Sequence, residues 1–149
     1  MPDAQSRTGP TRRADYRLFL PVTTRWMDND VFGHVNNAHY YSFFDTAVCT
    51  VLVRHGILGV AGPAYIMMVA ESGCRYHSEA AFPQTLSAGL RVVRLGRSSV
   101  RYGIGVFQDG AELAAADGFL VHVCVDAGSR RPAPLPDRWR SVLAQLEGD

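Results

Sequence analysis

Residues 36–56, with the sequence NNAHYYSFFDTAVCTVLVRHG, contain the pattern that decides the fold. Apolar side chains recur there three and four residues apart, at Tyr40, Phe43, Phe44, Ala47, Val48, Val51 and Leu52. This spacing places them on one face of an α-helix. Asn36 or Asn37 can cap the helix start, because a side-chain oxygen there accepts an unpaired backbone N–H, and Gly56 is typical of a helix end. The helix carries almost no charge, so we expect the rest of the chain to enclose it.

Beyond the helix, the apolar pattern changes from helical spacing to alternation, which predicts β-strands. We expect strands at residues 17–26, 64–78, 85–95, 98–108 and 113–125, and a short C-terminal helix at residues 137–147. Pro21 in the first strand suggests a sheet edge or a bulge, and Asp109-Gly110 suggests a hairpin turn. Because few crossover helices are available, the sheet should be antiparallel. The sequence thus predicts an α+β fold, a five-stranded antiparallel sheet wrapped around one long helix.

The composition fits one globular domain. The chain has 149 residues, of which 47% are hydrophobic, and this is enough to bury a core. All 15 basic residues are Arg, and 14 acidic residues bring the formal charge to +1. This balance argues against a nucleic-acid-binding protein, which usually has a strong basic excess. No stretch approaches the ~20 apolar residues that cross a bilayer, so we expect no membrane partner.

The N-terminus and the cysteines bear on the location of the protein. Residues 1–15 mix Pro, Gly, Arg and Asp without an apolar run, so they are neither a signal peptide nor a membrane anchor. We expect a flexible arm there and a single domain over residues 16–149. Cys49, Cys74 and Cys124 cannot all pair within one chain, and none has a C-x-x-C spacing. We therefore expect reduced, buried thiols in a cytoplasmic protein.

The densest cluster of chemically useful side chains lies just before the helix, in residues 25–41, RWMDNDVFGHVNNAHYY. A helix N-terminus offers unpaired N–H groups and a partial positive charge that can polarise a carbonyl. A nearby carboxylate, Asp28 or Asp30, can attack that carbonyl or activate a water. The alternative is structural: both Asp could be turn residues and Gly33 a residue with positive φ. The His residues of the segment could suggest a metal, but their spacing matches no metal motif.

The pattern R-W-x-D-x-D-x-x-G-H-V-N-N-A-x-Y, at residues 25–40, resembles a known signature. It is similar to that of the hot-dog fold acyl-coenzyme A thioesterases of the 4-hydroxybenzoyl-CoA thioesterase type. The pattern lies between the first strand and the long helix, as that family requires. The order of the predicted strands fits the hot-dog fold over roughly residues 16–127.

The resemblance implies roles for the residues of this loop. Asp30 would be the catalytic carboxylate, acting as base or as nucleophile. Backbone N–H groups around Asn36 and Asn37 would polarise the thioester carbonyl. The supporting residues would be Asp28, which hydrogen-bonds the loop, together with Gly33 and His34.

A second informative stretch is RVVRLGRSSVR, residues 91–101, which is rich in Arg and has no acidic residue. Guanidinium and hydroxyl groups at a turn can bind phosphate oxygens. In the resembling family this hairpin lies near the nucleotide end of coenzyme A, which makes Arg94, Arg97 and Ser98 the candidates for binding it. The alternative is a solvated outer face, because Arg91 and Arg101 share the parity of a solvent-facing strand surface.

We therefore expect an acyl-CoA thioesterase that releases a free acid and coenzyme A. It would need no metal and no separate cofactor, since coenzyme A is part of the substrate. Hot-dog subunits pair at their sheet edges, so the resemblance also implies a homodimer or a tetramer of dimers. Two alternatives stay open: a hot-dog acyl-CoA hydratase or dehydratase, which needs a His and Asp acid/base pair, and a non-catalytic acyl-CoA-binding module. His77 and His122 on predicted strands could line a pocket, although such residues more often face solvent or a local partner.

Overall fold

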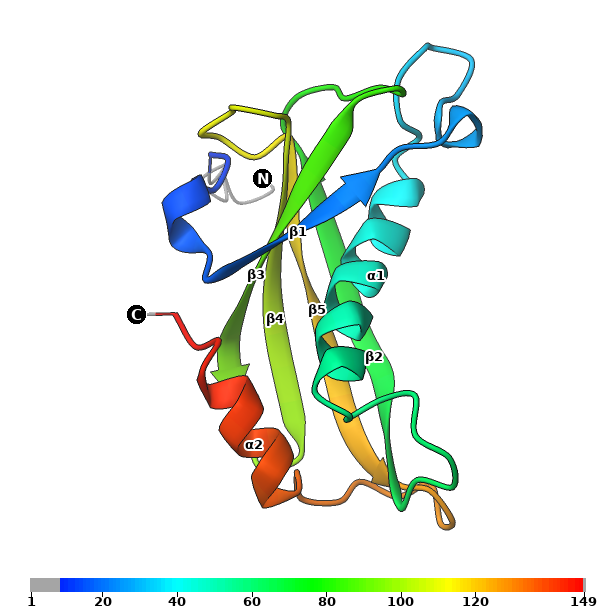
Figure 1. Ribbon diagram of the computed structural model, residues 1–149, viewed down its shortest axis with the longest axis vertical. Helices are drawn as coiled ribbons and strands as arrows, with labels where there is room; N and C mark the ends of the chain where they lie inside the picture. The colour runs from blue at the N-terminus through cyan, green and yellow to red at the C-terminus, as the bar shows by residue number, and fades with distance from the viewer. Residues whose placement is uncertain (1–8, 149) are drawn as a thin grey trace, which may run out of the picture.

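The computed structural model describes residues 9–148, which form a five-stranded sheet and two α-helices (Figure 1). The strands are β1 (Leu18–Thr23), β2 (Tyr65–Tyr76), β3 (Thr85–Leu95), β4 (Ser99–Phe107) and β5 (Ala116–Asp126), and the helices are α1 (His39–Arg54) and α2 (Asp137–Ala144). The sheet order is β1-β3-β4-β5-β2, and every neighbouring pair is antiparallel. The predicted α+β fold is confirmed, with differences only at the ends of some strands and helices.

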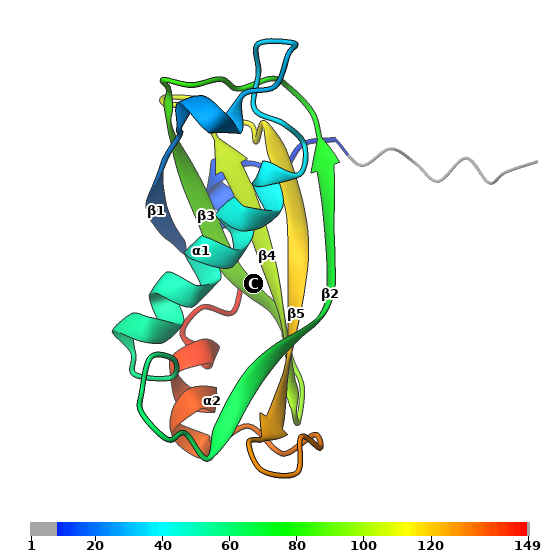
Figure 2. The same ribbon diagram turned by 90° about the vertical axis from the view of Figure 1, so that its right-hand side faces the viewer.

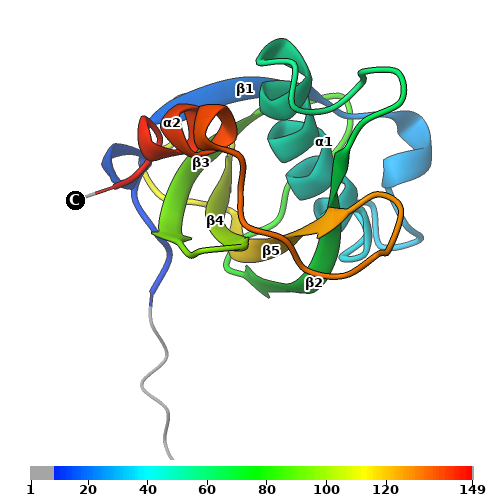
Figure 3. The same ribbon diagram turned by 90° about the horizontal axis from the view of Figure 1, so that it is seen from below.

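The long helix α1 lies in the hollow of the curved sheet (Figure 3). Its buried residues are those of the predicted stripe: Tyr40, Phe43, Phe44, Ala47, Val48, Val51 and Leu52. They share one core with inward-facing strand residues such as Leu90 and Ile104, which are fully buried. Trp139 and Leu143 of α2 join the same core. Because burying a large aliphatic side chain contributes about 1.5–3 kcal/mol, this layer is the main source of stability.

Both ends of α1 are defined by the residues that the sequence indicates. The Asn36 side chain accepts a hydrogen bond from the Ala38 N–H at 2.9 Å, just before the first helical residue. At the other end, Gly56 has a φ of +68°, a conformation that favours glycine. The chain reverses there, and the Ile57 N–H donates to the carbonyl of Leu52 at 2.8 Å. Local capping chemistry therefore fixes where the helix begins and ends.

Two strands lie at the edges of the sheet. One is β1, which carries Pro21, as expected for a residue that cannot donate a backbone hydrogen bond. The other is β2, which runs along one side of the molecule in Figure 2 and pairs only with β5. Most of its side chains are exposed or half-buried, including Met68 at 46% and Val69 at 52%. The β2 edge is therefore an unpaired and partly apolar surface.

The N-terminal segment differs from the predicted arm over residues 1–15. Residues 1–8 lie outside the described residues. Thr11, in contrast, donates to the carboxylate of Asp117 from its backbone N–H at 2.8 Å and from its hydroxyl at 2.9 Å. These partners are 106 residues apart, so no local pattern could have indicated the contact. Residues 11–15 belong to the folded domain rather than to an arm.

The cysteines also differ in part from expectation. All three are free, and Cys124 is buried. Cys49 and Cys74 are only half-buried, because they lie on a flank of α1 and on the edge strand β2. The expectation of complete burial is therefore wrong for these two residues.

Candidate active site

The loop between β1 and α1 lies at the end of the sheet where β3 begins, as Figure 1 shows. Asp28 holds this loop together. Its fully buried carboxylate accepts hydrogen bonds from the Arg25 N–H at 2.7 Å and from Arg25 Nη2 at 2.9 Å. Its carbonyl accepts the Asn36 N–H at 2.8 Å. The loop is therefore tied to the start of α1 through one residue.

The environment of Asp28 keeps it ionised. Burial by itself raises the pKa of this carboxyl, but the hydrogen bonds and the charge of Arg25 outweigh burial and hold that pKa below its ordinary value. His39 Nδ1 lies 3.8 Å from the same carboxylate. Asp28 thus has the surroundings of a structural ion pair, closed to a ligand.

Asp30, two residues later, has a different environment. Its backbone forms a tight turn in which the Gly33 N–H donates to the Asp30 carbonyl at 3.1 Å and Gly33 has a φ of +83°. The carboxylate oxygen Oδ1 accepts the Phe32 N–H at 2.9 Å. Among residues 9–148, no donor lies within hydrogen-bonding distance of the other oxygen, Oδ2. The turn thus fixes the carboxylate by one oxygen and leaves the second available.

His34 lies between two carboxylates. Its Nε2 is 3.9 Å from Oδ2 of Asp30, and its Nδ1 is 3.3 Å from Oε1 of Glu79. The ring also stacks on Phe32, with centroids 6.2 Å apart. His34 therefore lies beside Asp30, beyond hydrogen-bonding distance, and restricts where the Asp30 side chain can move.

The N–H groups just before α1 are not all paired within the described residues. The Asn36 N–H donates to Asp28, the Ala38 N–H to the Asn36 side chain and the His39 N–H to the Asn36 carbonyl. No acceptor in the described part of the chain pairs with the Asn37 N–H. The Asn37 carbonyl accepts the Tyr76 hydroxyl at 2.8 Å, which fixes this peptide against β2. Of the two candidate donors, only Asn37 is available to a ligand.

These groups meet at a cavity of about 440 Å³. Its walls are Asp30, Phe32, His34, Val35, Asn37, Tyr40, Tyr76, His77, Ser78 and Glu79. Three of the sequence candidates, Asp30, His34 and Asn37, line it directly. Asp28, Gly33 and Asn36 shape the loop without lining the cavity. The volume is within the range of roughly 300–1,000 Å³ that is usual for small-molecule sites.

Part of this cavity was not apparent from the sequence. Tyr76, His77 and Glu79 come from the end of β2 and the loop after it, 46 to 49 residues beyond Asp30. No motif surrounds them, and only the packing of β2 beside α1 brings them to the site. The one signal in the sequence was the presence of His77 on a predicted strand.

Arg94, Arg97 and Ser98 lie at the other end of the sheet, near α2 (Figure 1). Main-chain carbonyls of this turn accept hydrogen bonds from Arg140 Nη2 and from the Leu135 N–H. The eleven residues of β3 separate the turn from the Asp30 loop, which corresponds to roughly 35 Å of extended strand. Within one chain, therefore, the two sets of candidate residues are not brought together.

Metal-binding clusters and membrane-spanning helices are both absent from the described residues. The described residues contain no group of three or more His, Cys, Asp or Glu side chains arranged to hold a metal ion. Across residues 9–148, no helix is long and apolar enough to span a membrane.

Comparison with known proteins supports the fold. The crystal structure of the PA5185 protein from Pseudomonas aeruginosa is 46% identical, with a TM-score of 0.90, over 94% of this chain and 98% of that chain. The PA2801 protein, a candidate thioesterase from the same organism, is 27% identical with a TM-score of 0.77, over 83% and 95% of the two chains. A 1,4-dihydroxy-2-naphthoyl-CoA thioesterase from Synechocystis has the same fold, with 16% identity and a TM-score of 0.78 over 86% and 96%.

No match was found among curated proteins. The model of the thioesterase-like superfamily, in contrast, matches residues 22–146, which include the loop, α1 and the whole of the sheet from Val22 onward. With this match and the hot-dog architecture of its structural neighbours, the chain belongs to the thioesterase-like superfamily.

Proposed function

We propose that this protein is an acyl-CoA thioesterase, which hydrolyses the thioester to a free carboxylic acid and coenzyme A. One observation carries the proposal: Asp30, which keeps one carboxylate oxygen without a donor among the described residues, and Asn37, whose N–H has no acceptor there, line the same cavity of about 440 Å³. Hydrolysis of a thioester needs these two elements, a base or nucleophile and a donor for the developing oxyanion. Membership of the thioesterase-like superfamily supports the same chemistry.

In this proposal, the thioester carbonyl oxygen lies against the Asn37 N–H. Attack on the carbonyl carbon moves negative charge onto that oxygen. The N–H and the positive end of the α1 dipole then stabilise the charge. Removing one such donor typically costs about 10²–10³ in kcat. The Tyr76 hydroxyl donates to the Asn37 carbonyl, which belongs to the following peptide, and so restrains the backbone of Asn37 on the side away from its N–H.

Asp30 brings about nucleophilic attack on the acyl carbon by one of two routes. As a base, it takes a proton from water, and the water oxygen bonds to the acyl carbon. As a nucleophile, its own oxygen bonds to that carbon and gives a mixed anhydride, which water then hydrolyses. In both routes the C–S bond breaks, and the coenzyme A thiolate leaves and takes up a proton. His34, 3.9 Å from Asp30, is a candidate for moving that proton.

Coenzyme A would be held as part of the substrate, with no separate cofactor and no metal. We assign its nucleotide phosphates to Arg94, Arg97 and Ser98. Because this turn lies at the far end of β3 from the Asp30 loop, the turn that serves a given cavity would come from a neighbouring copy of the chain. The proposed site is therefore complete only when at least two copies of the chain associate.

The assembly would be a homodimer, or a tetramer of dimers, formed through the β2 edge. An unpaired strand with exposed apolar side chains such as Met68 and Val69 is a ready pairing surface. The loop beside the cavity is similarly uncovered, with Val31 at 94% exposure and Phe32 at 80%. A second copy would bury both regions. Light scattering after gel filtration tests this, since a monomer at all concentrations would rule out the assembly.

The proposed location is the cytoplasm. Three free thiols support a reducing compartment, because secreted proteins usually pair their cysteines.

The test is a thiol-release assay on a panel of acyl-CoAs with short, long and aromatic acyl groups. The proposal predicts release from at least one of them, at a rate proportional to enzyme concentration. Folded protein that binds coenzyme A but releases no thiol from any member would exclude the thioesterase and favour the acyl-CoA-binding module.

A second candidate, an acyl-CoA hydratase or dehydratase, is favoured by one observation, the proximity of His34 to Asp30. Such an enzyme needs an acid and a base directed at the α and β carbons of the acyl group. An enoyl-CoA added to the protein would then lose its conjugated absorbance without releasing thiol. The thioesterase proposal predicts thiol release instead.

A further inference from the structure

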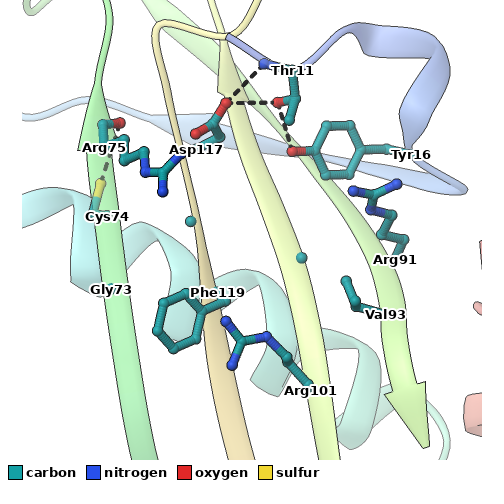
Figure 4. Close-up of a pocket in the computed structure, with 12 residues that line it drawn as sticks. Thr11, Tyr16, Gly73, Cys74, Arg75, Arg91, Val93, Arg101, Asp117 and Phe119 are labelled. Carbon is teal, nitrogen blue, oxygen red and sulfur yellow. Dashed lines mark hydrogen bonds between the residues drawn. The ribbon is translucent and has the colours of Figure 1, made fainter. Parts of the chain in front are cut away.

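A second hollow, of about 430 Å³, lies on the opposite face of the sheet from α1 (Figure 4). Its walls come from β2, β3, β4 and β5 and from the N-terminal segment. Three arginines line it, Arg75, Arg91 and Arg101. Two of them belong to the Arg-rich stretch of the sequence but point away from the turn at residues 96–98. The outer face therefore concentrates positive charge in a concave place.

The guanidinium groups are held in place by aromatic rings. The Arg101 guanidinium carbon lies 3.8 Å from the centre of the Phe119 ring, and that of Arg91 lies 5.5 Å from the centre of the Tyr16 ring. Figure 4 shows both side chains lying across the strands rather than extending into solvent. Such stacking orders an Arg before a ligand arrives and keeps the edge of the guanidinium plane available for hydrogen bonds. On Arg91 one of these bonds is already formed, because Nη1 donates to the Asp15 carbonyl at 3.4 Å.

Glycines make room for this arrangement. A Cβ at Gly103 would come within 3.1 Å of Arg91 Nε, and a Cβ at Gly73 would overlap the ring of Phe119. Side chains at these two positions would fill the floor of the hollow and displace the groups that line it. The absence of a side chain at Gly73 and Gly103 thus leaves room for the Phe119 ring and for the Arg91 side chain.

Arg91 and Arg101 have no ion pair with a carboxylate of the described residues. The buried Nε of Arg91 also has no hydrogen-bond partner there. The one carboxylate in the wall, Asp117, is already engaged. It accepts hydrogen bonds from Thr11 at 2.8 and 2.9 Å, and it lies 3.0 Å from His77 Nε2. Two ordered guanidinium groups therefore lack an anion.

We propose that this hollow binds the phosphate of a small organic phosphate, up to the size of a nucleotide. Phosphate presents several acceptor oxygens and two charges, which match a hollow lined by two guanidinium groups better than a single carboxylate does. The hollow is large enough for one such molecule. It also lies next to the cavity with Asp30, because Asp117 in its wall contacts His77 in the wall of that cavity.

Calorimetric titration with inorganic phosphate and with AMP tests the proposal without using turnover. The wild-type chain should bind AMP, and Arg91→Gln and Arg101→Gln should each weaken binding at least about tenfold, as expected for the loss of a hydrogen bond to a charged group. Arg131→Gln, which removes an exposed charge from a distant loop, should leave binding unchanged. A thermal melt of each variant verifies folding. No binding by the wild type at millimolar AMP, or equal binding by all variants, would overturn the proposal.

Steady-state kinetics distinguish two sources of the phosphate. If the nucleotide part of acyl-CoA occupies the hollow in place of the turn with Arg94, Arg97 and Ser98, Arg101→Gln should raise KM for acyl-CoA but not for the matching acyl-N-acetylcysteamine thioester, and Arg97→Ala should not raise either KM. If a free nucleotide occupies it, both KM values stay constant while AMP binding is lost. Because the titration does not depend on hydrolysis, an inactive protein would contradict the thioesterase proposal and leave this site standing.

Discussion

His122 is expected to make the stability of the protein depend on pH. Its side chain is 3% exposed, packs edge-on against Tyr102 with ring centroids 5.5 Å apart, and has no partner for Nδ1 among the described residues. Burial lowers the pKa of His122 from 6.5 to about 4, although the charge of Asp45 opposes that shift. The folded protein thus keeps the ring neutral at pH values where the unfolded chain protonates it.

The magnitude follows from the two pKa values. The contribution of neutral His122 to the free energy of unfolding is fully present above about pH 6.5. It is lost as the pH falls towards 4, because in that window only the unfolded state gains the proton. A tenfold change in proton affinity corresponds to about 1.4 kcal/mol, so the full loss is about 3 kcal/mol. Roughly 2 kcal/mol of it is expected between pH 7.5 and pH 5.

Urea unfolding at pH 7.5 and pH 5, at one protein concentration, measures this loss. In His122→Gln, which cannot titrate, the difference between the two pH values should shrink by about 2 kcal/mol. His55→Gln, an exposed control at the end of α1, should retain the wild-type difference. An NMR titration of the wild-type ring gives a second measurement if the variant folds poorly. An unchanged pH dependence in His122→Gln, or a ring that titrates near pH 6.5, would refute the reasoning.

Three other changes have defined outcomes. Asp28→Asn should lower the free energy of unfolding by about 1–3 kcal/mol, because it weakens a buried, charged hydrogen-bond network; urea unfolding at neutral pH measures it, and an unchanged midpoint would contradict the anchoring role. Gly118→Ala should destabilise strongly, because the added Cβ would overlap the carbonyl oxygen of Gly73 on β2; a thermal melt with the wild-type midpoint would contradict this packing. Arg97→Ala should raise KM for acyl-CoA but not for a thioester without the nucleotide, and equal effects on both would remove Arg97 from the binding site.

The sequence predicts those parts of the fold that depend on neighbouring residues. The buried face of α1, from Tyr40 to Leu52, follows from helical periodicity alone, and Gly56 ends the helix through its own backbone preference. The edge position of β1 follows from Pro21, which cannot complete a central strand. Each of these features depends on residues that are close together in the sequence.

Features that depend on distant contacts could not be predicted in the same way. The anchoring of Thr11 by Asp117 joins segments at opposite ends of the chain. The cavity walls from Tyr76 and Glu79 depend on how β2 packs beside α1. Parity in the sequence places Arg91 and Arg101 on an outer strand surface, apart from Arg94 and Arg97, but it could not predict that this surface is hollowed. Adjacent strand residues point to opposite faces, so one basic stretch divides between two places.

Asp30 is the residue on which the proposed chemistry depends most directly. Its side chain contributes one hydrogen bond within a surface turn, so Asp30→Asn should leave folding nearly intact. The decisive measurement is kcat of Asp30→Asn with the best acyl-CoA of the panel, on protein whose melting temperature matches the wild type. The account predicts a fall of at least about 100-fold, the lower range for loss of a catalytic base. Wild-type turnover by the folded variant would contradict it.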